Sequence, residues 1–154
     1  MLVVKNKVNT KLSILEIEAD MIVFEKDDVE STMYFVIEGS VQIYNNDHGV
    51  ENKLALVRKH EFFGETEMYT NLPRVNAAKV IEKALLVAIP SQADFENFVS
   101  ENRWLSGKIM ETMSERLAVA NDALAAKRSM ESTVKIEISD AHKEDKSARR
   151  IIRK

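Results

Sequence analysis

The chain has 154 residues, of which 45% are hydrophobic and 31% charged, and its formal net charge is −3 at pH 7. This length can bury one sizeable core but is short for two ordinary domains, so we expect one compact domain with appendages. The sequence contains no cysteine, which excludes disulfides, thiolate nucleophiles and cysteine-ligated metal centres. No apolar run approaches the ~20 residues that cross a bilayer. Because the first residues also lack a signal-peptide pattern, we expect a cytoplasmic protein.

The first part of the chain, from Lys11 to Ile89, has short β-branched and aromatic runs separated by polar turns. This spacing is typical of a small all-β unit. Asn45–Gly49 is the predicted loop of a hairpin, because Asn, Asp and Gly tolerate the positive φ values of such turns. The predicted strands are Leu12–Ile17, Ile22–Phe24, Tyr34–Glu38, Ser40–Tyr44, Lys53–Val57, Ala77–Glu82 and Ala84–Ile89.

After Pro90 the hydrophobic period changes from that of strands to that of a helix. Ser91, followed by Asp94, resembles a capping box and predicts a helix start. The pattern predicts a long amphipathic helix that bends or breaks near Asn102. Its first part can pack on the β unit, whereas the part beyond Leu117 needs a partner, so we expect a homodimer. The expected stripe consists of Leu105, Ile109, Met113, Leu117, Ala120 and Leu124.

The last segment, residues 129–154, is poor in hydrophobic residues and rich in charge. From Lys127 to Lys154 there are nine Lys and Arg against five Asp and Glu, which leaves the rest of the chain at −7. We therefore predict a domain over residues 1–128, including a C-terminal helix over 91–128, and a flexible basic tail. Val134–Ile138 alternates like a short strand, but a solvated tail is the preferred interpretation. The acidic body is a poor surface for duplex DNA.

The most informative segment runs from Phe62 to Ala77. Gly64 predicts a tight turn that opens into one helical turn, and free N–H groups at such an opening attract anions. Arg74, which follows Pro73, can add a bidentate guanidinium, so phosphate is the expected guest. Glu65 can accept hydrogen bonds from a sugar hydroxyl. The alternative is purely structural: a turn glycine between core residues, with Glu65 and Arg74 forming an internal ion pair.

The order of these residues resembles the phosphate-binding cassette of cyclic-nucleotide-binding domains. Upstream, Ile22–Phe24, Asp28 and Tyr34–Ile43 are similar to the core of that family. Downstream, its last strands and C-terminal helices are matched by Ala77 or Ala78, Leu85–Ile89, Phe95 and Arg116–Leu117. The resemblance implies a mainly β fold: an antiparallel, jelly-roll-like β-roll followed by a long amphipathic helix.

The resemblance also implies roles for individual residues. Glu65 would bind the ribose 2′-hydroxyl, Arg74 the cyclic phosphate, and the N–H groups of Thr66 and Glu67 the phosphate oxygens. Leu117 or Leu124 would close over the base. The full expected ligand site consists of Phe63, Gly64, Glu65, Thr66, Glu67, Arg74, Val75 and Asn76.

Several residues depart from the family pattern. Glu67 stands where a small residue is usual, and a carboxylate facing the phosphate would oppose binding by about 4 kcal/mol at 4 Å and an effective dielectric near 20. If Glu67 faces water, most of that penalty disappears. Val75 and Asn76 replace the usual small or hydroxyl residues. Asp27 and His60 stand where turn glycines are expected, and both residue types tolerate positive φ.

No catalytic machinery is evident, so we expect a binding protein and not an enzyme, with no cofactor other than a cyclic nucleotide as ligand. His48, His60 and His142 have no second ligand at a metal spacing. The leading hypothesis is a cyclic AMP or cyclic GMP sensor that signals through its C-terminal helix to a protein partner. The alternative is a dimeric scaffold that has lost nucleotide binding. Only a tail follows the helix, so we expect no specific DNA binding. Because no apolar run is long enough to cross a bilayer, we also expect no membrane partner.

Overall fold

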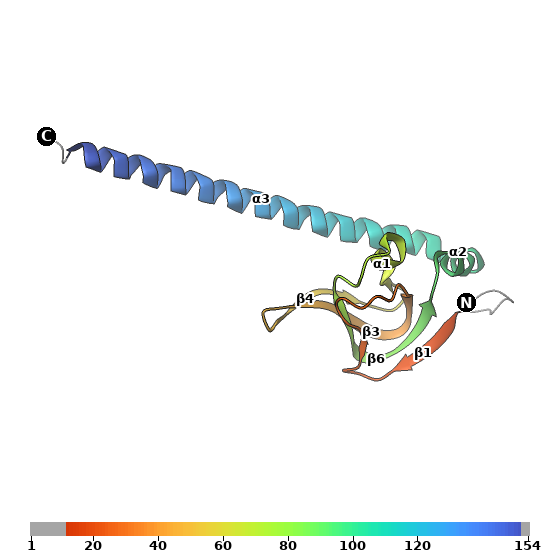
Figure 1. Ribbon diagram of the computed structural model, residues 1–154. Coiled ribbons are helices and arrows are strands. Elements are labelled where there is room, and N and C mark those ends of the chain that lie inside the picture. Colours follow the sequence, from red (N-terminus) through yellow and green to blue (C-terminus); the bar gives the residue numbers. More distant parts are fainter. Residues whose placement is uncertain (1–11, 152–154) are drawn as a thin grey trace. The chain divides into compact units, whose positions relative to one another are not determined.

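The computed structural model describes residues 12–151, and for residues 138–151 it describes the backbone alone. A six-stranded antiparallel sheet forms the roll, with the strand order β1-β6-β3-β4, while β2 pairs with β6 and β5 with β3 (Figure 1). The strands are β1 (Ser13–Ile17), β2 (Ile22–Phe24), β3 (Met33–Asp47), β4 (Val50–Val57), β5 (Phe62–Phe63) and β6 (Ala77–Ile89). The helices are α1 (Glu65–Thr70), α2 (Gln92–Glu101) and α3 (Leu105–Ile151).

Two long strands replace four of the predicted ones. The predicted breaks at Gly39 and Lys83 lie inside β3 and β6, which pair with each other on both sides of a register shift. Gly39 has φ +82°, and a Cβ there would lie 2.3 Å from the Lys83 carbonyl oxygen. Gly39 therefore marks a bend within β3 where the backbones of β3 and β6 approach closely, and it does not end the strand.

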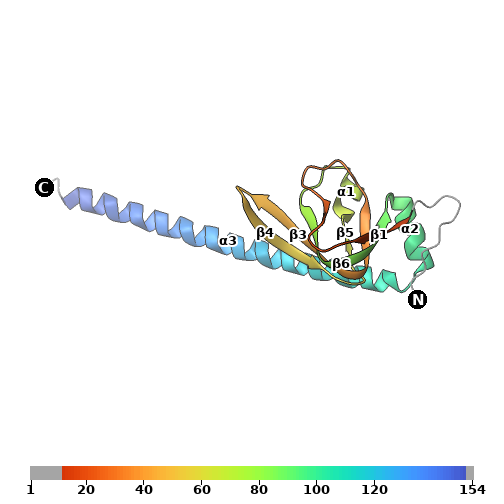
Figure 2. The ribbon, with the colours of Figure 1, turned by 90° about the horizontal axis from the view of Figure 1, so that it is seen from below.

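The β3–β4 hairpin is tighter than predicted. Asn45, Asn46 and Asp47 belong to β3, and only His48 and Gly49 form the turn. Figure 2 shows β3 and β4 side by side as a hairpin. Both turn residues have positive φ, 51° and 82°, as a two-residue hairpin turn requires. The polar residues that suggested a loop are accommodated in the strand, where Asn45 is half-buried and Asn46 and Asp47 are exposed.

The core consists of two hydrophobic clusters on opposite faces of β3, since successive strand residues point to opposite faces. Tyr34 and Val36 belong to the first cluster, inside the roll, together with Phe63. Met33 and Phe35 belong to the second, together with Phe62 of β5. The second cluster also contains Met68 of α1, Phe98 of α2 and Leu105 of α3.

The predicted helix start and break are both confirmed. The Ser91 hydroxyl accepts a hydrogen bond from the Asp94 N–H and donates one to the Asp94 carboxylate. Helix α2 ends at Glu101, with Asn102 as its C-cap. Leu105, the first residue of the predicted dimer stripe, is fully buried in the second cluster.

Helix α3 continues beyond the predicted domain end. Residues 129–151 are helical, so the strand-like alternation of Val134–Ile138 does not produce a strand. The chain divides into two compact units between Glu111 and Thr112. In the second unit Leu117 and Leu124, two residues of the predicted stripe, are exposed. Within residues 12–151, no helix is apolar over a length that would span a membrane.

Candidate functional site

The site begins where β5 meets α1. Phe63 is buried and stacks on Tyr34, with ring centroids 5.1 Å apart. Gly64 then takes the left-handed conformation, φ +78°, as the N-cap of α1. A Cβ at Gly64 would lie 2.9 Å from Arg74 Nη1 and 3.0 Å from the Thr32 carbonyl oxygen. Both the backbone conformation and the approach of the arginine therefore require glycine here.

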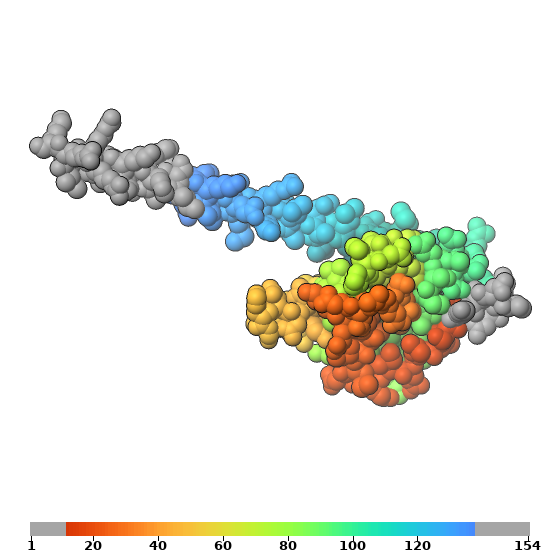
Figure 3. Space-filling model, in the orientation of Figure 1, coloured from red at the N-terminus to blue at the C-terminus, as the bar shows by residue number. Residues whose placement is uncertain are grey.

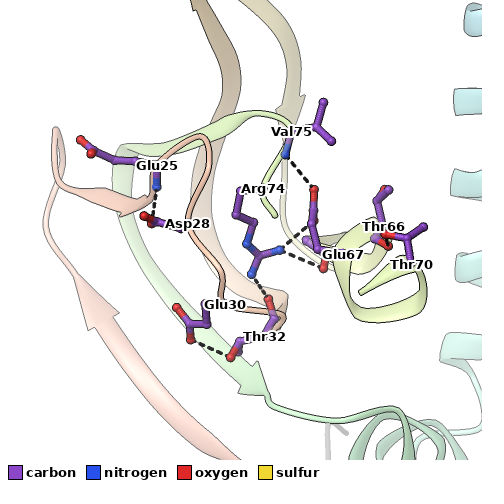
Figure 4. Close-up of polar contacts among 10 residues, drawn as sticks. Glu25, Asp28, Glu30, Thr32, Thr66, Glu67, Thr70, Arg74 and Val75 are labelled. Carbon is purple, nitrogen blue, oxygen red and sulfur yellow. Dashed lines mark hydrogen bonds and ion pairs between the residues drawn. The ribbon is translucent and has the colours of Figure 1, made fainter. Parts of the chain in front are cut away.

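Arg74 is the centre of the site, and its side chain is fully buried. Nη1 donates to the Gly64 carbonyl oxygen at 3.1 Å and to Glu67 Oε2 at 2.8 Å (Figure 4). Nη2 donates to the Thr32 carbonyl oxygen. The guanidinium lies over the Phe24 ring, 4.0 Å from its centroid, in a cation–π contact.

The backbone of Arg74 is fixed by the loop that follows β2. The Arg74 N–H donates to the Asp28 carbonyl oxygen, and the Asp27 N–H donates to the Arg74 carbonyl oxygen. Asp27 has φ 70° and His60 has φ 69°, which confirms that these two residues take the glycine-like conformation. Figure 3 shows the α1 segment and the loop between β2 and β3 side by side at the surface.

Glu67 faces inward, which resolves the two orientations that the sequence left open. It is only 6% exposed, and its Oε1 accepts a hydrogen bond from the Val75 N–H at 3.3 Å. Its carboxylate thus bridges the guanidinium of Arg74 and a backbone donor. The structural alternative proposed Glu65 as the ion-pair partner of Arg74, and the partner is Glu67 instead.

The remaining predicted site residues lie around this pair. Glu65 is half-buried at the first position of α1. Thr66 is exposed, and the Thr66 carbonyl oxygen accepts a hydrogen bond from the Thr70 hydroxyl. Val75 is exposed and Asn76 half-buried in the bend that leads to β6.

Two contributors to the site were missed from the sequence. Thr32 acts through its carbonyl oxygen, which every residue type possesses, and so gave no signal. Phe24 was assigned only to a strand, and no sequence pattern links it to Arg74.

Beside its polar partners, Arg74 has aromatic neighbours, since the Phe24 ring that it covers stacks on Tyr34. Burial raises the pKa of Tyr34 to about 12, with a further rise from the charge of Glu30 and an opposing effect of Arg74. The phenol of Tyr34 is therefore neutral at ordinary pH, close enough to the charge of Arg74 for its pKa to respond to it. Among the residues that the structure describes, no group of three or more His, Cys, Asp or Glu side chains could hold a metal ion.

Helix α1 connects the site to the other helices of the first unit. Met68 packs in the same cluster as Phe98 and Leu105, and its carbonyl oxygen accepts from Gln92 Nε2 at 3.2 Å. A cavity of about 440 Å³ with a mainly apolar lining lies beside these contacts. Residues of all three helices line it, among them Tyr69, Phe95, Val99, Ile109 and Met110.

The first unit is thus an antiparallel roll that holds a buried arginine against the short helix α1. The family model described as "Cyclic nucleotide-binding domain" matches residues 14–102. This match covers more than half of the chain, which therefore belongs to the cyclic-nucleotide-binding domain family. Membership supports a nucleotide-sensing module in general terms.

Known relatives agree with this assignment. The potassium channel KAT1 of rice (Oryza sativa subsp. japonica) is 26% identical over 109 residues, which cover 68% of this chain but 15% of the channel. The catabolite activator protein of Thermus thermophilus has a TM-score of 0.60 at 22% identity, covering 73% of this chain and 53% of its own. The cAMP-bound regulatory domain of Toxoplasma gondii protein kinase A has a TM-score of 0.52 at 21% identity, covering 59% and 34%. At these identities the two structures show the fold alone.

Proposed function

We propose that this chain is a cytoplasmic sensor module that binds a cyclic nucleotide, of the cyclic AMP or cyclic GMP kind, and is not an enzyme. The observation that carries this proposal is Arg74, a fully buried cation held against the opening of α1. An arginine offers the geometry and charge that a phosphate needs. In the proposed complex Glu65 accepts the ribose hydroxyl, and the N–H groups of Thr66 and Glu67 contact the phosphate.

Ligand binding would be signalled through α1. Met68 shares a core cluster with Phe98 and Leu105, so a displacement of α1 must be accommodated by α2 and by the start of α3. A ligand that binds better to one arrangement of these helices shifts the population toward it. The proposed receiver of the signal is a protein partner that contacts the C-terminal helix.

We further propose a homodimer built on α3. Leu117 is 63% exposed and Leu124 is 48% exposed, and they lie seven residues apart on the predicted stripe. Because Leu105 is buried, the proposed seam consists of the later positions only. Light scattering at tens of micromolar protein should report a dimer that Leu117→Lys dissociates, and a wild-type monomer would contradict this seam.

The second candidate function is a dimeric scaffold whose site no longer binds nucleotide. The ion pair between Glu67 and Arg74 favours it, because the cation already has an anion. In such a protein the roll would have only a structural role, and α3 would bind the protein partner.

Isothermal calorimetry and thermal melts with cyclic AMP, cyclic GMP and cyclic dinucleotides separate the two functions. A sensor is stabilised by at least one of these ligands, since a ligand that binds only the folded state raises the melting temperature. Arg74→Ala should weaken binding by about 2–5 kcal/mol, and Glu65→Ala by less. Arg58→Ala, which removes an exposed arginine of the same roll, is the matched control. A wild type that ignores every nucleotide supports the scaffold.

A further inference from the structure

The Arg74–Glu67 pair has the arrangement of an occupied anion site. One carboxylate receives a guanidinium donor at Oε2, 2.8 Å away, and a backbone N–H donor at Oε1, 3.3 Å away. The two donors come from consecutive residues, Arg74 and Val75, and the acceptor comes from α1. Both side chains of the ion pair are shielded from solvent, 0% and 8% exposed.

A phosphate cannot bind Arg74 while the carboxylate of Glu67 is paired with it. Arg74 has no exposed surface, so an external ligand reaches its guanidinium only after the surrounding groups move. Glu67 supplies the carboxylate among the contacts of this guanidinium. Two anions at one cation would also repel each other strongly in a buried setting. One N–H donor of the guanidinium is unsatisfied, because Arg74 Nε is buried without a hydrogen-bond partner among the residues that the structure describes.

We propose that Glu67 lowers the affinity of this site for phosphate-bearing ligands: its carboxylate is an internal occupant of the anion position and competes with the phosphate of any external ligand. The nucleotide part of this proposal rests on the proposed sensor function, whereas the anion position rests on the ion pair itself. The wild type then requires a higher ligand concentration than a chain without this carboxylate.

The first test measures the anion position without any nucleotide. Glu67→Ala leaves Arg74 buried and unpaired, so the melting temperature should fall. Sodium acetate or inorganic phosphate should restore part of the loss, while chloride at matched ionic strength should not. Glu51→Ala is the matched control, because it removes a glutamate that pairs with Lys79 at the partly exposed surface, 3.3 Å away. Its melting temperature should show no selective response to acetate.

The second test measures competition directly. Cyclic AMP should bind Glu67→Ala about ten- to a hundredfold more tightly than the wild type, because one like charge is removed beside the phosphate. Glu67→Gln keeps the size of the side chain and removes its charge, so it should give an intermediate affinity. It also provides a measurement if Glu67→Ala does not fold.

The outcomes distinguish this proposal from the sensor function. Selective rescue by acetate or phosphate, with no nucleotide binding by any variant, supports the anion position and overturns the sensor. Equal cyclic AMP affinity in the wild type, Glu67→Ala and Glu67→Gln, without rescue of either variant by acetate or phosphate, overturns the role of Glu67 and leaves the sensor standing.

Discussion

Two ion-pair regions of the roll have similar distances and opposite surroundings. In the cassette, Arg74 and Glu67 are 2.8 Å apart, and their side chains are 0% and 8% exposed. On the surface, Lys83 lies 2.5 Å from Glu16 and 2.8 Å from Glu18, and these side chains are 54–69% exposed. Distance therefore does not distinguish the two regions, whereas access of water does.

The surface region still affects proton binding. The hydrogen bonds that Lys83 donates to Glu16 and Glu18 raise the pKa of Lys83 above its ordinary value, and Lys83 lowers the pKa of Glu16. Water and salt screen these charges, so the effect on folding is small. In the cassette no such screening exists, and the loss of one partner leaves the other charge buried.

The largest expected effect is that of Arg74→Ala, which should lower the free energy of unfolding by about 3–5 kcal/mol. The cause is the uncompensated carboxylate of Glu67. Urea denaturation gives the value, and the double variant Arg74→Met with Glu67→Leu is the control. It should recover most of the loss, since apolar side chains of similar volume need no counter-ion. A double variant no more stable than the single one would contradict this cause, and would show that the lost hydrogen bonds from Arg74 to the Gly64 and Thr32 carbonyl oxygens dominate.

Gly64→Ala should destabilise the fold by about 1–3 kcal/mol from the left-handed backbone alone, and further through collision with Arg74. Gly49→Ala separates the two causes. Gly49 has a similar φ, +82° against +78°, but a Cβ there meets nothing within 4 Å. Chemical denaturation should show a clearly larger loss at Gly64, and equal losses would mean that the guanidinium simply moves aside.

Alkaline pH provides a smaller test of the buried region. The pKa of Tyr34 is raised from 10.0 to about 12, so the folded state favours the neutral phenol. This contribution to stability is complete below pH 10 and is lost as the pH rises through about 12. Tyr34→Phe should remove this part of the pH dependence, and its tyrosinate absorbance should lack the highest titration step. An unchanged absorbance titration would contradict the assignment.

The smallest expected effect is that of Lys83→Ala, which breaks two ion pairs at the surface. The melting temperature should change little, and the small difference from the wild type should shrink as salt is added. Thermal melts at low and high ionic strength measure this. A loss comparable to that of Arg74→Ala would remove the distinction between the two regions.

Local signals predicted much of the molecule. Gly64 predicted the tight turn that opens into α1, and Ser91 with Asp94 predicted the start of α2. Asp27 and His60 took the left-handed conformation expected of them. The errors also had local causes, because the sequence pattern does not show whether a glycine or a polar residue ends a strand or lies within it. Gly39 and Asn45 both lie inside β3.

By itself, the sequence determined an all-β unit followed by helices, the family pattern and the identity of the charged residues between Phe62 and Ala77. These features depend on periodicity, capping and turn chemistry within a few residues. Only the tertiary structure decided which carboxylate faces Arg74, because the cage around the guanidinium brings Thr32 to Arg74 across 42 positions of the chain. Glu67 departs most from the family pattern, and Arg74 is the central residue of that pattern. In the buried environment of the folded chain, Glu67 is the counter-ion of Arg74.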